Sequence, residues 1–364
     1  MPGVTILEHE LSELRLLVER QTGILLDCPN SALAAHVAEY LETRELVSPA
    51  ALLERLRASD LDPSILTEFL DGILNIKTGF FRHPGAMNAL SRQVVPQIYA
   101  RKSCDGPCTL RVWSAGCATG EEPYSIAMAI CEAMPNGNGT TNGNGNGNGS
   151  TNGSKDSKSK TTMKSNGGIA DSAPAACPPP LKDWSIHIVG TDLLASSIEV
   201  AERGLYPQSA LTGLPPASIR ASFSRIGNAN GGSNGMQDAS SALLKDGLDG
   251  AARIPSNGSS DGGAHLLVKP RLRSLVTFNT MNLTKPVYIG RFDCIFCMDV
   301  LPHLSRTQRT ALTERLHLYL EPGGYLFLSQ TEKLSAPNLN FRAETFDGYT
   351  FYRKPLAASA AYGR

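Results

Sequence analysis

The stretch SAGCATGEEPYSIAMA, residues 114–129, decides the fold class because it places a glycine turn between two regular elements. A short apolar run at 110–113 precedes it, and apolar residues recur at helical spacing after it. The pattern predicts a strand, a tight loop and a helix. Such a loop usually presents free N–H groups and the positive end of the helix dipole to an anion, commonly a phosphate.

Two adjacent carboxylates, Glu121 and Glu122, stand at this helix start and would repel a phosphate. A positively charged ligand without phosphate fits better, and S-adenosylmethionine, with its sulfonium and α-ammonium groups, is the common one. A purely structural alternative exists, because Thr119-x-x-Glu122 also has the form of a capping box. Both interpretations stay open on this stretch alone.

The composition bounds the class of protein. The 364 residues allow two or so domains, and 34 basic residues balance 34 acidic ones. This balance gives no indication of nucleic-acid binding or of a polybasic membrane anchor. The chain has no run of 18 apolar residues and no apolar leader after its charged start, so we expect a cytoplasmic protein without membrane insertion.

The eight cysteines show no framework spacing, which suits reduced thiols. Cys294 and Cys297 lie in one strand run, where a separation of three sends their side chains to opposite faces. Cys104 and Cys108 flank a turn without further ligands to complete a site. We therefore expect no metal site.

The order of elements predicts an α/β fold. Residues 1–95 carry amphipathic stripes typical of a helical N-terminal domain, and Ser48-Pro49 has the form of an N-cap followed by proline. Residues 96–364 alternate β-rich runs with helices, which favours a doubly wound, mostly parallel, Rossmann-like sheet. The predicted strands are 110–115, 185–192, 275–283, 292–300, 324–331 and 348–354, and the predicted helices are 123–134, 194–203 and 305–320. Two segments, 136–170 and 227–264, are low-complexity insertions that we expect to be disordered.

Several polar residues fall where such a sheet binds nucleosides, at the carboxyl ends of its strands. Asp192 ends the second strand and can accept hydrogen bonds from a ribose, although an ordinary helix N-cap is the alternative. Asn282 follows the next strand and suits an adenine edge. Met298 and Asp299 should line the floor of the same crevice. Arg82, from outside the sheet, could hold a carboxylate through two parallel bonds.

These stretches together resemble the CheR family, the chemotaxis protein-glutamate methyltransferases. The resemblance runs from about residue 10 to 353, without the two insertions. The motifs that carry it are TGFFR (78–82), VWSAGCATGEEPYSIAMA (112–129), GTD (190–192), NL (282–283), FDCIFCMDV (292–300), LEPGGYLFLSQTEKL (320–334) and TFYRK (350–354).

The resemblance implies an S-adenosylmethionine-dependent methyltransferase that esterifies glutamate side chains of membrane chemoreceptors. It also implies a small antiparallel β subdomain inserted at about 205–278, in a chain that we expect to be a monomer. By matched position, Glu122 would bind the methionine part of the cofactor, Asp192 the ribose, and Asn282 with Leu283 the adenine. The remaining matched residues, beside cofactor or substrate, are Thr78, Arg82, Met298 and Asp299.

The chain departs from the family around the acceptor. Ile76 stands where the family commonly has an asparagine, Asp299 replaces the asparagine of an Arg-Asn-Val motif, and His303 replaces the tyrosine near the transferring methyl. Arg82 and His303 are therefore the candidate catalytic residues. The departures leave an alternative open, a sensor or scaffold that binds S-adenosylmethionine without methyl transfer, or a methyltransferase with another acceptor. A nicotinamide-dependent oxidoreductase is disfavoured by the absence of GxGxxG and by the acidic helix start.

Overall fold

The computed structural model describes residues 6–58, 63–74, 77–105, 108–134, 184–226, 265–287, 289–334 and 338–356. Both low-complexity segments and Ile76 lie outside the described residues, so the expectations for them remain predictions. Within the described part of the chain, no helix combines the length and apolarity that crossing a membrane requires.

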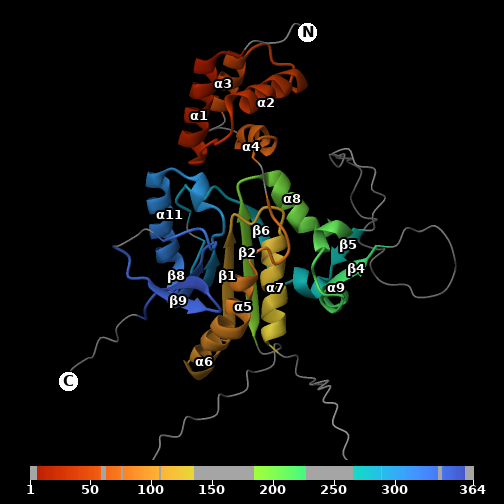
Figure 1. The fold of residues 1–364 in the computed structure, drawn as a ribbon, viewed down its shortest axis with the longest axis vertical. Coiled ribbons are helices and arrows are strands. Elements are labelled where there is room, and N and C mark those ends of the chain that lie inside the picture. Colours follow the sequence, from red (N-terminus) through yellow and green to blue (C-terminus); the bar gives the residue numbers. More distant parts are fainter. Residues whose placement is uncertain are drawn as a thin grey trace, which may run out of the picture.

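A seven-stranded sheet forms the centre of the molecule (Figure 1), in the order β6-β2-β1-β7-β8-β10-β9. The first five strands of that order run parallel, and β10 and β9 complete the sheet antiparallel to their neighbours. Their bounds are β1 Thr109–Ala115, β2 Ser185–Asp192, β6 Val276–Thr280, β7 Phe292–Phe296, β8 Leu320–Phe327, β9 Arg342–Phe346 and β10 Tyr349–Arg353. The predicted α/β fold with a mostly parallel sheet is confirmed. The polar edge strand β9 was not predicted.

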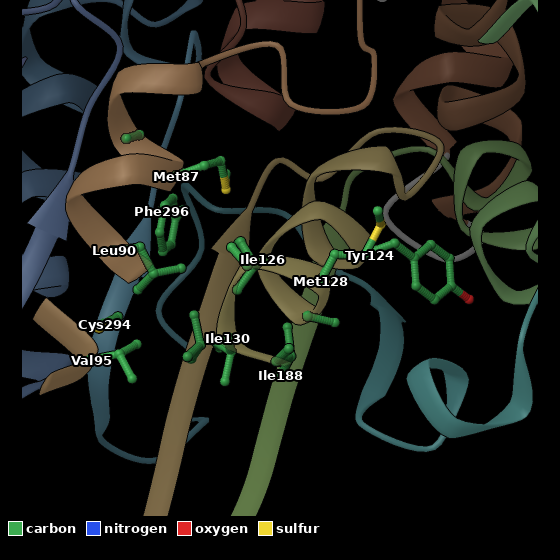
Figure 2. Packing of buried hydrophobic residues seen from close by; sticks show 14 of the residues in the cluster. Met87, Leu90, Val95, Tyr124, Ile126, Met128, Ile130, Ile188, Cys294 and Phe296 are labelled. Atoms are coloured by element: carbon green, nitrogen blue, oxygen red, sulfur yellow. The ribbon is translucent and has the colours of Figure 1, made fainter. Parts of the chain in front are cut away.

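Helices cover both faces of this sheet. One face packs on α5 (Pro84–Ala89), the π-helical turn η2 (Leu90–Val94), α6 (Val95–Asp105) and α7 (Glu121–Ala133), as Figure 2 shows. The other face packs on α11 (Arg306–Tyr319). All five residues of β7 are buried, because the central strand has a layer on each side. Cys294 lies in one layer and Cys297 in the other, which confirms their predicted opposite orientation.

Four helices form a separate core at one end of the molecule (Figure 1): α1 (Glu8–Thr22), α2 (Asn30–Thr43), α3 (Pro49–Arg57) and α4 (Pro63–Asp71). Ser48 caps α3 as the sequence indicates, because its Oγ accepts the Ala51 N–H at 3.2 Å. Leu194, at the start of α8 (Ala195–Arg203), joins this core. Helix α5 packs on the large sheet and not on this helical core, and the domain bounds 1–95 and 96–364 stay a prediction.

A small antiparallel sheet stands beside the large one, with β5 (His265–Val268) between β3 (Leu205–Pro207) and β4 (Phe223–Arg225). It also carries the turn η4 (Gln208–Leu211) and the helix α9 (Pro216–Ser222), and α10 (Pro270–Arg273) leads back to β6. The chain thus leaves the large sheet after α8 and returns at Val276. This is the antiparallel insertion that the family resemblance implies.

Candidate active site

The loop between β1 and α7 turns sharply at two glycines with left-handed backbone, Gly116 (φ 83°) and Gly120 (φ 94°). A Cβ on Gly116 would lie 2.5 Å from Val300 Cγ2, and one on Gly120 would lie 2.6 Å from Ala201 Cβ. The Gly116 N–H donates to the Thr191 carbonyl at 2.8 Å. Both positions therefore need glycine for the turn and for close packing, and the loop is fixed at the carboxyl ends of β1 and β2.

The two adjacent glutamates of α7 have different surroundings. Glu121 is 7% exposed, and its Oε2 accepts hydrogen bonds from the hydroxyls of Thr119 at 2.7 Å and Thr78 at 3.3 Å. Glu122 lines the cavity beside the loop, where its Oε1 accepts from Ser114 Oγ at 2.7 Å. Glu121 thus connects the Thr78 segment to the loop, whereas Glu122 faces the space where a ligand can bind.

The capping-box alternative for this helix start is wrong. The N-cap of α7 is Gly120, which has no side chain to accept a bond, and the Thr119 hydroxyl donates to Glu121 instead of capping the helix. The sequence spacing was correct for a capping box, but the left-handed glycine shifts the helix start by one residue.

Burial raises the pKa of Glu122 to about 7, against the lowering effect of the Ser114 hydrogen bond. The nearby carboxylates of Asp299 and Glu332 raise this pKa further, and Arg82 opposes them. The ionised carboxylate therefore has too little positive charge around it. A cationic group in the cavity would supply that charge, so the site fits the ammonium of S-adenosylmethionine and disfavours a phosphate.

Asp192 joins the loops that follow β1 and β2. Its Oδ2 accepts the Ala118 N–H at 2.9 Å and its Oδ1 accepts the Leu194 N–H at 3.0 Å. Burial raises the pKa of Asp192, and the backbone hydrogen bonds counteract this rise. The residue is not the N-cap of α8, a position taken by Leu194. Asp192 lines the cavity, where the second lone pair of each oxygen can accept a ribose hydroxyl.

Asn282 and Leu283 lie in the loop after β6, on the same cavity. The Asn282 side chain donates through Nδ2 to the Gln21 carbonyl at 3.0 Å and accepts through Oδ1 from the Thr284 N–H at 2.9 Å. Arg315 Nη2 donates to the Leu283 carbonyl at 2.7 Å. The Asn282 amide therefore connects this loop to α1. An adenine edge would bind either to the remaining hydrogen-bonding capacity of this amide or to the neighbouring backbone.

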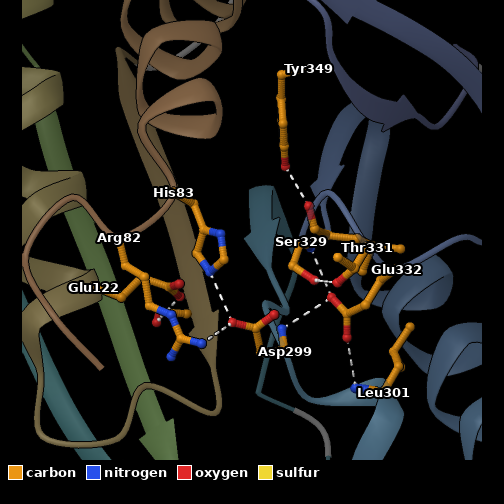
Figure 3. A network of polar contacts seen from close by, with 11 residues as sticks. Arg82, His83, Glu122, Asp299, Leu301, Ser329, Thr331, Glu332 and Tyr349 are labelled. Atoms are coloured by element: carbon orange, nitrogen blue, oxygen red, sulfur yellow. Dashed lines mark hydrogen bonds and ion pairs between the residues drawn. The ribbon is translucent and has the colours of Figure 1, made fainter. Parts of the chain in front are cut away.

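A cluster of charges forms one wall of the cavity (Figure 3). Asp299 Oδ2 lies 2.9 Å from Arg82 Nη2 and 3.1 Å from His83 Nε2. Asp299 has a left-handed backbone with φ of 56°, which is uncommon for a residue with a side chain. The substitution of an asparagine by Asp299 thus gives this chain an ion pair with the arginine predicted to hold the acceptor.

The segment after α1 also lines the cavity and is joined to the loop after β7. The Leu25 N–H donates to the His303 carbonyl at 2.8 Å, and Ile24 pairs with Leu304 in an isolated antiparallel bridge. His303 lies in the turn η6 (Leu301–His303) and lines the cavity. The helical N-terminal region therefore contributes to the site through its own backbone.

The cavity has a volume of about 1010 Å³, at the upper end of the range for ligand pockets. It brings together every site residue that the sequence predicted: Thr78, Arg82, Glu122, Asp192, Asn282, Leu283, Met298, Asp299 and His303. Sequence reasoning missed His83, Lys77, Cys117, Thr22 and residues 24–29. For the last of these, Gly23, the left-handed C-cap of α1, indicates the end of the helix but not the contact with the cavity. Within the described residues, no group of His, Cys, Asp and Glu is placed to hold a metal ion.

Comparisons with known proteins agree with this arrangement. The family described as "CheR methyltransferase, SAM binding domain" matches residues 76–142 and 247–349. The chain is 25% identical to "Chemotaxis protein methyltransferase 1" of Pseudomonas aeruginosa over 324 residues, which are 88% of this chain and 89% of that protein. It is 24% identical to "Chemotaxis protein methyltransferase" of Vibrio parahaemolyticus over 337 residues, or 92% and 93% of the two chains.

Among solved structures, a magnesium protoporphyrin IX methyltransferase from Synechocystis with bound SAM aligns with a TM-score of 0.27 and 14% identity. That alignment covers 80% of this chain and 94% of the other. The family match and the full-length relatives carry the assignment, and the chain belongs to the CheR family of S-adenosylmethionine-dependent methyltransferases.

Proposed function

We propose that this enzyme transfers the methyl group of S-adenosylmethionine to glutamate side chains on the cytoplasmic part of a chemoreceptor-type protein. The relatives named as chemotaxis protein methyltransferases match nearly the whole chain, which supports an acceptor of this class. The observation that carries the proposal is Glu122, a cavity-facing carboxylate with a pKa of about 7 at a helix start that would otherwise attract phosphate.

The chain's own residues suit the two ends of the methyl donor. Glu122 would hold the α-ammonium and Asp192 the ribose hydroxyls, while the Asn282–Leu283 loop would border the adenine. Thr78 and Met298 complete the cavity wall on the side of the helix start. When bound, S-adenosylmethionine supplies an activated methyl group on a sulfonium sulfur.

Methyl transfer to a carboxylate needs no general base, because a glutamate of unperturbed pKa about 4.3 is already ionised at neutral pH. The protein must instead place the carboxylate oxygen in line with the methyl carbon and its leaving group. Positioning of this kind can contribute about 7–11 kcal/mol to catalysis. Within the described residues, Asp299 is the one ion-pair partner of Arg82, so the remaining guanidinium N–H groups can orient an acceptor carboxylate.

The test is a tritium methyl-transfer assay on chemoreceptor cytoplasmic fragments, with calorimetry of S-adenosylmethionine on the same protein. We expect binding together with transfer, and the label should leave as volatile methanol under mild alkali, as methyl esters do. Fragments with alanine at the acceptor glutamates serve as the control. Binding without transfer would support the sensor or scaffold alternative, and an alkali-stable label would assign the enzyme to another kind of acceptor.

A further inference from the structure

A buried carboxylate outside the predicted site, that of Glu332, holds the loop that carries Asp299. Glu332 is 8% exposed and follows β8. Its Oε2 accepts the N–H groups of Asp299 at 3.1 Å and Ser329 at 2.8 Å, and its Oε1 accepts that of Leu301 at 3.0 Å (Figure 3). One side chain therefore satisfies three backbone donors from the loops after β7 and β8.

The loop after β7 depends on this support. Asp299 has φ of 56°, and a left-handed backbone at a residue other than glycine is retained only where its surroundings enforce it. Without an acceptor, the N–H groups of Asp299 and Leu301 would each be left as an unsatisfied donor, which is unfavourable away from water. Glu332 is therefore placed to enforce the conformation that directs Asp299 to Arg82.

The turn that carries Glu332 is itself held in place. The Glu332 N–H donates back to the Ser329 carbonyl at 3.0 Å, and the Tyr349 hydroxyl donates to the Leu328 carbonyl at 2.6 Å. A continuous set of contacts thus runs from β10 through Glu332 and the backbone of the neighbouring loop to the ion pair on the cavity wall (Figure 3).

We propose that Glu332 is a positioning residue for methyl transfer, which fixes Asp299 and through it orients Arg82 toward the acceptor carboxylate. The inference rests on the proposed function. Glu332 would act through backbone geometry and touch neither the methyl donor nor the acceptor.

Its charge provides an independent readout at Glu122. The pKa of Glu122 is raised by burial first and then by Asp299 and Glu332. The titratable and charged groups that interact with Glu122 are Arg82, Cys117, Cys297, Asp299, Glu332 and Tyr349. Loss of the charge in Glu332→Gln should lower the pKa of Glu122, whereas Glu332→Asp, which keeps the charge, should leave this titration in place.

The experiment compares Glu332→Gln, which removes the charge, with Glu332→Asp, which keeps the charge and shortens the side chain. Glu314→Gln, an exposed carboxylate on α11, is the matched control. We expect both Glu332 variants to lower kcat on the receptor fragment about 10- to 100-fold. The dissociation constant for S-adenosylhomocysteine at alkaline pH should change at least about tenfold less than kcat. Only Glu332→Gln should move the pH midpoint of S-adenosylhomocysteine binding to lower pH.

Several outcomes would overturn the inference. The first is a wild-type kcat in both variants, and the second is an equal change in kcat and in cofactor affinity. The third is loss of folding in both variants, measured by circular dichroism, which would assign Glu332 to stability alone. Failure of the proposed function gives a different result, because the wild-type protein itself would then transfer no methyl group. In that event there is no methyl transfer for Glu332 to support, and the inference falls together with the proposed function.

Discussion

At the scale of single residues, Glu122 is costly for folding and suited to its proposed ligand. Burial raises its pKa from 4.5 to about 7, so the fold favours the protonated form. Below about pH 4.5 the carboxyl is protonated in both the folded and the unfolded chain, so its burial costs the least stability. The free energy of unfolding then falls as the pH rises through about 7, because the buried carboxylate loses its proton. The proposed ammonium ligand needs the ionised form, so binding and folding favour opposite protonation states of this side chain.

The first prediction concerns the pH dependence of cofactor binding. Affinity for S-adenosylmethionine, measured by calorimetry across pH, should fall as the pH drops through about 7, because Glu122 becomes protonated and loses its attraction for the ammonium group. Glu122→Gln should bind weakly at every pH and should melt at a higher temperature above neutral pH, by about 2–4 °C per kcal/mol of relieved cost. A steep pH dependence retained in Glu122→Gln would assign the titration to another group.

The second prediction concerns Arg82, whose Nη2 lies 2.9 Å from Asp299 Oδ2. Arg82→Ala should lower kcat by about 100-fold, because the acceptor carboxylate loses its orienting group, and should change cofactor affinity far less. Arg82→Lys keeps the charge without the planar fork and should recover only part of the loss. Equal loss of kcat and of cofactor affinity in Arg82→Ala would reassign this residue to cofactor binding.

At the scale of elements, the β1–α7 turn combines backbone strain with close packing. Gly120 and Gly213 have nearly the same left-handed backbone, with φ of 94° and 95°. A Cβ on Gly120 would lie 2.6 Å from Ala201 Cβ and 2.9 Å from Tyr206 Oη, whereas one on Gly213 would have no atom within 4 Å. The pair therefore separates the cost of the backbone conformation from the cost of the contact.

The third prediction uses this pair. Gly213→Ala should lower the free energy of unfolding by about 1 kcal/mol, the cost of the left-handed backbone alone. Gly120→Ala should cost more, by about 1–3 kcal/mol, and should weaken S-adenosylmethionine binding because α8 and the loop must move apart. Chemical denaturation and calorimetry measure the two effects, and equal destabilisation by both variants would contradict the packing argument.

At the scale of the whole molecule, α1 and the segment after it are joined to two loops of the sheet. Asn282 bonds the Gln21 carbonyl at 3.0 Å, and Thr284 Oγ1 donates to the Thr22 carbonyl at 3.0 Å. The Leu25 N–H donates to the His303 carbonyl at 2.8 Å. The cavity wall formed by Thr22 and residues 24–29 therefore depends on bonds between distant parts of the chain.

The fourth prediction tests these bonds between the α1 region and the loops of the sheet through Thr284. Thr284→Val removes the hydroxyl that donates to the Thr22 carbonyl and should cost about 1 kcal/mol of stability. Hydrogen exchange of residues 22–29 should become faster, and the affinity for S-adenosylmethionine should fall with it. Thr284→Ser keeps the hydroxyl and should behave as the wild type. Unchanged hydrogen exchange in Thr284→Val would show that other contacts hold the α1 region against the loops of the sheet.

Local patterns in the sequence determined much of this protein. Residues 114–129 predicted the strand, the glycine loop and the helix start, and polar residues at successive strand ends predicted side chains that the structure gathers around one cavity. These predictions succeed because strand and helix periodicity are local, and because parallel strands bring their carboxyl ends to one edge. The small antiparallel sheet followed from the family resemblance, while the edge strand β9 has too little apolar alternation to be recognised.

The family resemblance pointed to Glu122 as the ligand-binding glutamate, but only the tertiary structure showed what each of the two glutamates contacts. Successive residues on a helix point about 100° apart, so α7 directs Glu121 to Thr78 and Thr119 and leaves Glu122 toward the ligand space. The pair between Arg82 and Asp299 and the support of Asp299 by Glu332 join residues far apart in sequence. Such contacts exist only when the folded sheet brings its loops together, because no periodicity in a linear sequence specifies a long-range hydrogen bond.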